Sequence, residues 1–302
     1  MATGTFVAGG IRGALMGTVM ALFFVVVVAP LVGLVLNGAD RVVTARLQGR
    51  VGPPLLQPLY DLVKLWRKEP LVVNRVQIGY VYLHLAFMVM TLVLLALGGD
   101  MVLALFAHAF SALSLVIGAS SVRSPFSRIG AQRKIMQMLA YEPVFILLVV
   151  GIYLRTGSFM ASAVGRLDAP LIVSLPLVFL AYLVALEIKL EKSPFDVATS
   201  HHAHQELVKG VTLEYAGPYL ALIEVAHFYE TFLLLGIVAA FFVRQIWLGV
   251  GVALVVYAGA IVVDNVCARL RTTWMVRCLW TVPVMLAVCN IIWLYVRRTQ
   301  GG

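Results

Sequence analysis

Long runs of apolar residues, separated by charged connections, fill this sequence. Eight runs can be delimited, at 13–36, 78–98, 101–121, 136–154, 170–188, 219–243, 247–265 and 278–296. An α-helix rises ~1.5 Å per residue, so about 20 apolar residues cross the hydrocarbon of a bilayer. The pattern therefore predicts an all-α integral membrane protein with about eight transmembrane helices, in which residues 1–302 form a single membrane domain.

The first connection contains a helical pattern of its own. After the break at Gly52-Pro53-Pro54, apolar residues recur at helical spacing, opposed by charged ones. A helix with one apolar and one charged face is suited to lie on a membrane surface. We therefore predict an amphipathic surface helix over 55–68.

Composition supports the assignment to a membrane. Of the 302 residues, 62% are hydrophobic and only 12% are charged, whereas soluble domains carry about 25% charged residues. The net charge of +9 could suggest a nucleic-acid partner. The basic residues lie in the connections between helices, however, and not on one folded face, so we predict no nucleic acid and take the lipid bilayer as the environment.

The positions of Lys and Arg predict the orientation. The connections after the first, third, fifth and seventh helices hold 17 of the 23 basic residues. By the positive-inside rule, these connections are cytoplasmic. We expect a multi-pass protein of the cytoplasmic (inner) membrane, with the main charged loops in the cytoplasm and both termini outside.

Acidic residues inside or beside the apolar runs indicate function, because an ionisable group at membrane depth is costly. Glu224, His227 and Glu230 recur every three residues and share one face of the sixth helix. Glu187 and Glu191 are four residues apart, so a helix would place both carboxyls on one face. We predict a proton path, and its candidates are Glu142, Glu187, Glu191, Asp196, Glu206, Glu214, Glu224, His227, Glu230 and Asp264. In the alternative, these acids only pair with Arg133, Arg269 or Lys189 and hold the helices together.

Histidines and cysteines give weaker signals. His201, His202 and His204 lie in the charged connection 187–217. Adjacent histidines do not easily ligate one ion, so contact with a partner or protonation near neutral pH is favoured over a metal site. His84 and His108 are isolated in apolar runs, where we expect helix–helix hydrogen bonds. The three cysteines lack the spacing of metal ligands and are expected to be buried thiols. No metal site is predicted.

Several motifs, taken together, resemble a known family. ARLQGRVGP at 45–53, followed by LLQPLYDLVKL at 55–65, is similar to the signature of the H subunit of complex I. That family includes the membrane subunits of formate hydrogenlyase and of Ech-type, energy-converting [NiFe] hydrogenases. Further family-like motifs follow in order: IGAQR at 129–133, AYE at 140–142, PFD at 194–196, ELVKG at 206–210, EYAG at 214–217, DN at 264–265 and ARLR at 268–271.

Two departures from the complex I pattern point to one branch of the family. TSHHAH at 199–204 stands where complex I carries a run of acids near its quinone chamber, and Lys189 stands where the family usually has a glutamate. Both features resemble the Ech-type branch. The resemblance implies the membrane-anchoring, proton-coupling subunit of a ferredoxin-linked [NiFe] hydrogenase complex. The alternatives are the H subunit of a quinone-reducing complex I and a stand-alone ion transporter.

The resemblance also implies a docking surface on the cytoplasmic side, where arginines are dense. Its expected partners are the hydrogenase large and small subunits and an iron–sulfur subunit, beside an antiporter-like membrane subunit. No cofactor or catalytic residue is expected on this chain, since the [NiFe] centre and iron–sulfur clusters would belong to the partners. The docking candidates are Arg41, Arg46, Gln48, Arg50, Asp61, Lys64, Arg128, Arg133, His201, His202, His204, Arg269 and Arg271.

Overall fold

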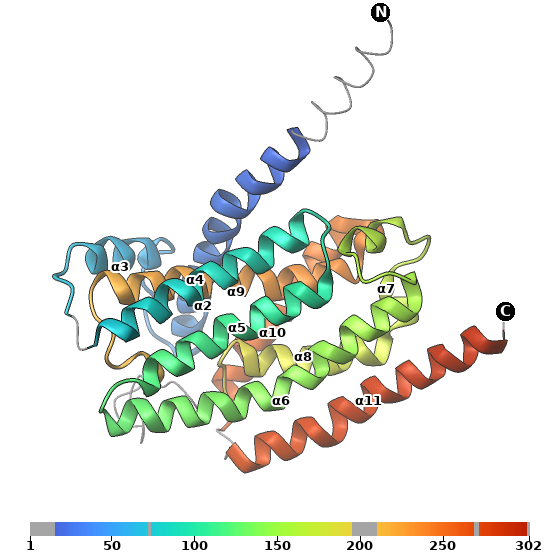
Figure 1. Cartoon of the computed structure of the whole chain (residues 1–302). Coiled ribbons are helices and arrows are strands. Elements are labelled where there is room, and N and C mark those ends of the chain that lie inside the picture. Colours follow the sequence, from blue (N-terminus) through green and yellow to red (C-terminus); the bar gives the residue numbers. More distant parts are fainter. Residues whose placement is uncertain (1–15, 72–73, 195–209, 269–271, 301–302) are drawn as a thin grey trace, which may run out of the picture.

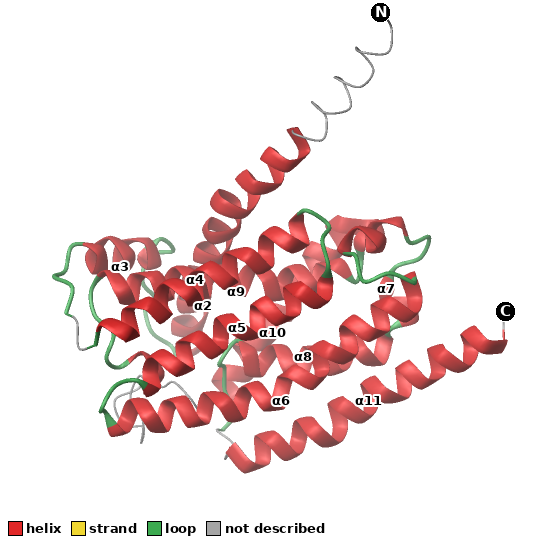
Figure 2. Ribbon diagram, viewed as in Figure 1, coloured by secondary structure: helices red, strands yellow, loops and turns green. Residues whose placement is uncertain are grey.

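The computed structural model of the protein describes residues 16–71, 74–194, 210–268 and 272–300. These residues are almost entirely helical (Figure 2). The elements in order are η1 (Phe24–Val28), α2 (Ala29–Leu47), α3 (Gln57–Trp66), α4 (Arg75–Ala96), α5 (Met101–Ser120), α6 (Pro125–Thr156), η2 (Ala161–Arg166), α7 (Leu171–Ser174), α8 (Pro176–Lys189), η3 (Gly210–Thr212), α9 (Pro218–Ala240), η4 (Val243–Gln245), α10 (Ile246–Val266) and α11 (Thr272–Gln300).

Among the described residues, seven helices are long and apolar enough to cross a membrane. They confirm seven of the eight predicted spans and the all-α class. Several helices are longer than the apolar runs from which they were predicted. The first reaches Leu47, the fourth begins at Pro125 and the last covers Thr272–Gln300. Hydropathy marks only the apolar part of a helix, whereas backbone hydrogen bonding continues into its polar ends. The amphipathic helix is confirmed as α3, over a shorter range than the predicted 55–68.

The fifth predicted span, 170–188, is a broken helix and corrects the prediction of eight continuous spans. The short α7 and the 14-residue α8 are separated at Leu175, whose backbone leaves the helical region. Asn290 of α11 bridges the break, because its side-chain oxygen accepts from the N–H groups of Leu177 at 2.9 Å and Val178 at 3.2 Å. Its amide nitrogen donates to the carbonyl of Ser174 at 3.0 Å. Backbone groups freed inside a membrane need such partners.

Local chemistry fixes the ends of the helices. Asn74 caps α4 by accepting from the N–H of Val76, and Asp100 caps α5 by accepting from Val102 and Leu103. Side-chain oxygens at these positions satisfy amide groups that the first helical turn leaves free. Gly157, with φ of 75°, ends α6 in the left-handed conformation that glycine adopts without strain.

The helices form a bundle whose charged connections gather at one end. Figure 1 shows α3, the α5–α6 turn and the end of α10 at one end, with the α4–α5 turn and α7 at the other. The core surrounds α6, α8 and α9. Tyr182 of α8 is fully buried, packs edge to face against Phe145 at 5.5 Å between ring centroids, and donates to the carbonyl of Leu234 at 2.8 Å.

Helices α2 and α9 approach closely at Gly33. A Cβ at this position would overlap the backbone carbonyl of Phe228 in α9. Small residues at helix crossings let backbones approach within a membrane, where van der Waals packing drives association. Gly33 therefore sets the distance between the first span and the helix that carries the stripe of Glu224, His227 and Glu230.

We predict that Gly33→Ala lowers the free energy of unfolding by about 1–3 kcal/mol, because the added methyl forces the two helices apart. Thermal unfolding in detergent measures the loss. Gly79→Ala in α4 is the matched control, since a Cβ at Gly79 meets no atom within 4 Å. Equal stability of the two variants would show that the α2–α9 contact does not depend on this glycine.

Candidate proton-relay site

A buried ion pair ties three helices together at the centre of the bundle. The ammonium of Lys189, at the end of α8, lies 2.7 Å from a carboxylate oxygen of Glu230 in α9. The same ammonium donates to the hydroxyl of Tyr141 in α6 at 3.0 Å and lies 4.6 Å from the centre of that ring. The Lys189 side chain is only 1% exposed. A buried charge of this kind is tolerated when its partner and hydrogen bonds are close.

The predicted acidic stripe on α9 leads from this ion pair toward the charged end of the bundle. Nδ1 of His227 lies 3.8 Å from the second carboxylate oxygen of Glu230. Glu224, one further step along the same face, lines a cavity of about 190 Å³ between α2, α3 and α9. Arg41, Asp61 and lysines of the α3 segment share this cavity with Glu224. Three titratable groups therefore cover ~9 Å of α9, given the helical rise.

Two further acids present a carboxyl oxygen without a partner. Oε1 of Glu142 and Oε2 of Glu187 are buried and accept no hydrogen bond from any described residue. Glu142 follows Tyr141 on α6, and Glu187 precedes Lys189 by two residues on α8. A buried carboxylate oxygen left unsatisfied costs ~1–3 kcal/mol or more, which a transferred proton or an entering water would relieve. These two carboxyls are therefore suited to exchange protons.

A second cluster joins α2 and α10 to the chain that follows α8. The ammonium of Lys192 lies 2.8 Å from Asp40 and 3.5 Å from Asp264. Asp264 also accepts from the backbone N–H of Ser193 at 2.8 Å. Asp264, a proton-path candidate, is thus partly neutralised by Lys192, which is 6% exposed.

The structure corrects the prediction that Glu187 and Glu191 share one helix face. Helix α8 ends at Lys189, and Glu191 has a positive φ of 54°. Its carboxylate turns away and pairs with the buried Lys134 of α6. The expected contact between two like charges is therefore replaced by a contact between opposite charges. The structure therefore shows both Glu191 and Glu230 in ion pairs.

The remaining loop candidates contribute less to the described site. Glu214 is half-buried and is followed by Tyr215, whose pKa burial raises to about 12. The candidates Asp196, Glu206, His201, His202, His204, Arg269 and Arg271 lie outside the described residues.

The predicted docking surface is partly assembled at the charged end. Arg41 of α2 pairs with Asp61 of α3 at 2.6 Å. Partial burial raises the pKa of Asp61, but hydrogen bonds from Arg41 and Gln57 and the positive charge of Arg41 outweigh it, so the pKa lies below its ordinary value. This pair links the surface helix to the first span.

The end of α2 meets the end of α10 at the same surface. Arg50 donates to the side-chain oxygen of Gln48, and Gln48 donates to Asn265 at 3.0 Å. Arg46, Lys64 and Arg128 project as exposed side chains. Arg133 is half-buried and has a partner. The described basic side chains therefore leave an accessible basic surface at the charged end of the bundle.

The structure confirms the prediction for His84 and contradicts the predictions for His108 and the cysteines. His84 confirms a helix–helix hydrogen bond, since its Nδ1 lies 2.9 Å from the hydroxyl of Ser111 in α5. His108 does not, because neither ring nitrogen has a partner among the described residues. The prediction of buried thiols is wrong: all three cysteines are exposed, on the outer surface of α11 and at the end of α10. Within the described part of the chain, no group of three His, Cys, Asp or Glu could hold a metal.

Sequence reasoning named Lys189 as a pairing partner of the acids but missed Lys134 and Lys192. Lys134, Lys189 and Lys192 are all nearly inaccessible, and each holds an acid from another segment. The available signal was their position beside apolar runs, where a surface lysine is unexpected. Counting Lys134 and Lys192 only as determinants of topology concealed their role.

Comparisons with known proteins agree with this fold. A family model described as NADH dehydrogenase matches residues 19–295. The H subunit of the NADH-quinone oxidoreductase of Anoxybacillus flavithermus is 30% identical over 66% of this chain and 67% of its own length. The corresponding H subunit of Rubrobacter xylanophilus is 28% identical over 87% of this chain and 89% of its own.

A solved structure shows the same arrangement of helices. A chain of the membrane-bound sulfane sulfur reductase, an archaeal respiratory membrane complex, superposes with a TM-score of 0.81 at 22% identity, covering 93% of this chain and 99% of that one. Fold and comparisons together define a multi-pass membrane subunit of a respiratory complex. The chain belongs to the NADH dehydrogenase family, among the relatives of its H subunits.

We predict that Lys189→Met destabilises the protein by about 3–5 kcal/mol, because it leaves Glu230 buried without its cation. Adding Glu230→Gln to Lys189→Met should restore most of the loss. Denaturant unfolding in detergent measures both variants. Arg41→Gln is the contrasting control, because its pair with Asp61 is about 39% exposed and such pairs contribute only ~0–1 kcal/mol. Equal losses at the two sites would contradict a buried, interdependent ion pair.

Proposed function

We propose that this chain is the membrane-anchoring and proton-coupling subunit of an Ech-like, ferredoxin-linked [NiFe] hydrogenase complex. It is a non-redox subunit, which carries no metal or cofactor of its own. Electrons would pass through partner subunits, namely the hydrogenase large and small subunits and an iron–sulfur subunit. An antiporter-like membrane subunit would continue the proton path beside it.

The observation that carries this proposal is a set of buried acids: Glu142 lies near Lys189 of the Lys189–Glu230 pair, and Glu187 lies near Lys192 and Asp264. Glu142 and Glu187 contribute buried carboxyl oxygens that lack partners among the described residues, and the α9 stripe connects the pair to the cavity beneath α3. A continuous row of titratable groups on facing helices is what transfer of protons through a dry bundle requires. The path would begin at the charged end, with Asp196, Glu206 and Glu214, and lead inward.

The exposed basic side chains at the charged end of the bundle support a docking role. Arg46, Arg128 and Lys64 are accessible, and guanidinium groups are well suited to bind carboxylates of a partner. A soluble arm bound here would place its redox chemistry above the cavity that Glu224 lines. The charged connections would then face the cytoplasm and both termini would lie outside.

The second candidate is the H subunit of a quinone-reducing NADH dehydrogenase. The names of the relatives in Anoxybacillus and Rubrobacter favour it. The motif TSHHAH at 199–204 and the lysine at position 189 favour the hydrogenase branch. Membership of a family of complex subunits makes a stand-alone transporter the weakest alternative.

Purification of the intact complex distinguishes the first two candidates. We expect nickel in stoichiometric amount by elemental analysis, hydrogenase subunits by mass spectrometry and no extractable quinone. A complex that contains quinone and no nickel would assign the chain to the quinone-reducing branch.

We predict that Glu142→Gln and Glu187→Gln each reduce coupled proton movement at least tenfold while the complex still assembles, because Gln cannot exchange a proton. Proton uptake by proteoliposomes that contain the complex gives the measurement, with subunit composition checked on the same sample. Asp168→Asn is the matched control, since Asp168 is exposed and precedes α7, at the opposite end of the bundle from the charged connections. Wild-type proton movement in both variants would remove these carboxyls from the path.

A further inference from the structure

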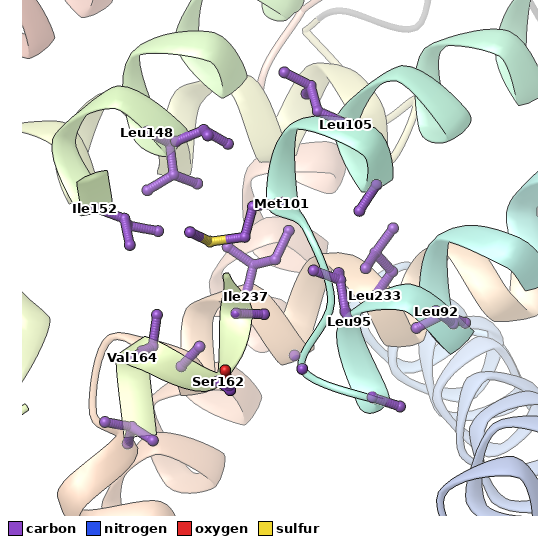
Figure 3. Close-up of a pocket in the computed structure, with 18 of the residues that line it drawn as sticks. Leu92, Leu95, Met101, Leu105, Leu148, Ile152, Ser162, Val164, Leu233 and Ile237 are labelled. Atoms are coloured by element: carbon purple, nitrogen blue, oxygen red, sulfur yellow. The ribbon is translucent and has the colours of Figure 1, made fainter. Parts of the chain in front are cut away.

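A large apolar cavity lies at the end of the bundle away from the charged connections. It has a volume of about 640 Å³ and is lined by the ends of α4, α5, α6 and α9 together with η2 and α7. Figure 3 shows Met101, Leu105, Leu148, Ile152, Leu233 and Ile237 arranged around one space. No charged residue in the described part of the chain lines the cavity. Its volume falls within the range of ligand sites, ~300–1,000 Å³.

One polar side chain stands at the inner end of this cavity. The lining residues farthest from this end of the bundle are Leu92 on α4, His108 on α5, Phe145 on α6 and Phe232 on α9. His108 lies seven residues beyond Met101, hence ~10 Å further along α5. Its ring is 3% exposed, stacks on Phe145 at 5.9 Å between centroids, and has no partner for either nitrogen among the described residues.

The two ring nitrogens of His108, which lack partners among the described residues, indicate that a ligand binds here. A neutral imidazole carries one donor and one acceptor, and burying either without a partner costs ~1–3 kcal/mol. His84 shows the ordinary solution, because it is bonded to Ser111. No equivalent hydroxyl from a described residue serves His108, although the cavity beside it provides room for a molecule that brings a polar group.

The cavity is accessible from the surface of a membrane-spanning helix. Gly236 of α9 lines it and is exposed, and a Cβ built there meets no atom within 4 Å. Because α9 spans the membrane, a molecule dissolved in the hydrocarbon of the bilayer can reach this opening without crossing water.

We propose that the cavity binds a long-chain fatty acid from the membrane, with the chain along the aliphatic lining and the carboxyl group against His108. A carboxyl group and an imidazole form a hydrogen-bonded pair that shares one proton and is neutral as a whole, whichever group holds it. An ester group offers only an acceptor, and a phospholipid head group stays at the membrane surface. The site lies at the opposite end of the bundle from the proposed docking surface and does not depend on the proposed function.

Photolabelling of the full-length protein in proteoliposomes tests the site. The probe is palmitic acid that carries a diazirine and an alkyne, and mass spectrometry locates the labelled residues. We expect label on the cavity-lining parts of α5, α6 and α9, removed by an excess of unlabelled palmitate. Gly236→Phe should block the opening and reduce this label at least tenfold. Gly251→Phe in α10 is the matched control, since a Cβ at Gly251 also meets nothing within 4 Å.

The carboxyl group is tested separately. His108→Leu should reduce labelling by the fatty acid at least tenfold, and methyl palmitate, whose ester only accepts a hydrogen bond, should compete with the probe at least tenfold less well than palmitate on the unmodified protein. Equal labelling of the His108→Leu variant, or equal competition by methyl palmitate, would show a chain site without a carboxyl anchor and overturn the proposal. Label confined to lipid-facing surfaces would overturn it as well. The competition experiment uses the unmodified protein, so its result stands even where a variant misfolds.

Discussion

The structure depends on a lysine ammonium that is held away from water between three helices. Lys189 ends α8, and its charge is matched by Glu230 from α9 and a hydroxyl from Tyr141 of α6. Taking a charge out of water is unfavourable by several kcal/mol unless its partners are placed accurately. The arrangement therefore requires that α6, α8 and α9 keep one relative position, which the aromatic packing around Tyr182 maintains.

The other buried lysines repeat this arrangement nearer the charged end. Lys134 pairs with Glu191, and Lys192 lies between Asp40 and Asp264. Each pair spans segments that are remote in the sequence, so the charges connect α2, α6 and α10 to the chain after α8. Movement of that connection would change the distances of three ion pairs at once.

Periodicity and hydropathy predicted the helices, the surface helix and the stripe on α9, because these are local properties of the chain. The family could be predicted from the motifs around residues 45–65 and 129–142. The partners of Lys134 and Lys192 could not: Lys192 and Asp40 are 152 residues apart, and nothing local selects one partner over another. The break at Leu175 lies within a run of high hydropathy, which conceals it; its local signal is Pro176, because the residue before a proline is disfavoured in the helical conformation. The cavity around His108 arises from the packing of several helices, which no single segment encodes.

The amide of Asn290 has a consequence for the order in which the bundle can mature. It supplies the acceptor for two backbone N–H groups of α8 and the donor for one carbonyl of α7, and it comes from α11, more than a hundred residues later in the chain. A ribosome delivers α8 to the membrane well before α11. Until α11 arrives, the interrupted fifth span has exposed backbone groups in an apolar surrounding, and the lysine at its far end lacks a fixed support. Insertion of the last described helix therefore completes a segment that was synthesised much earlier.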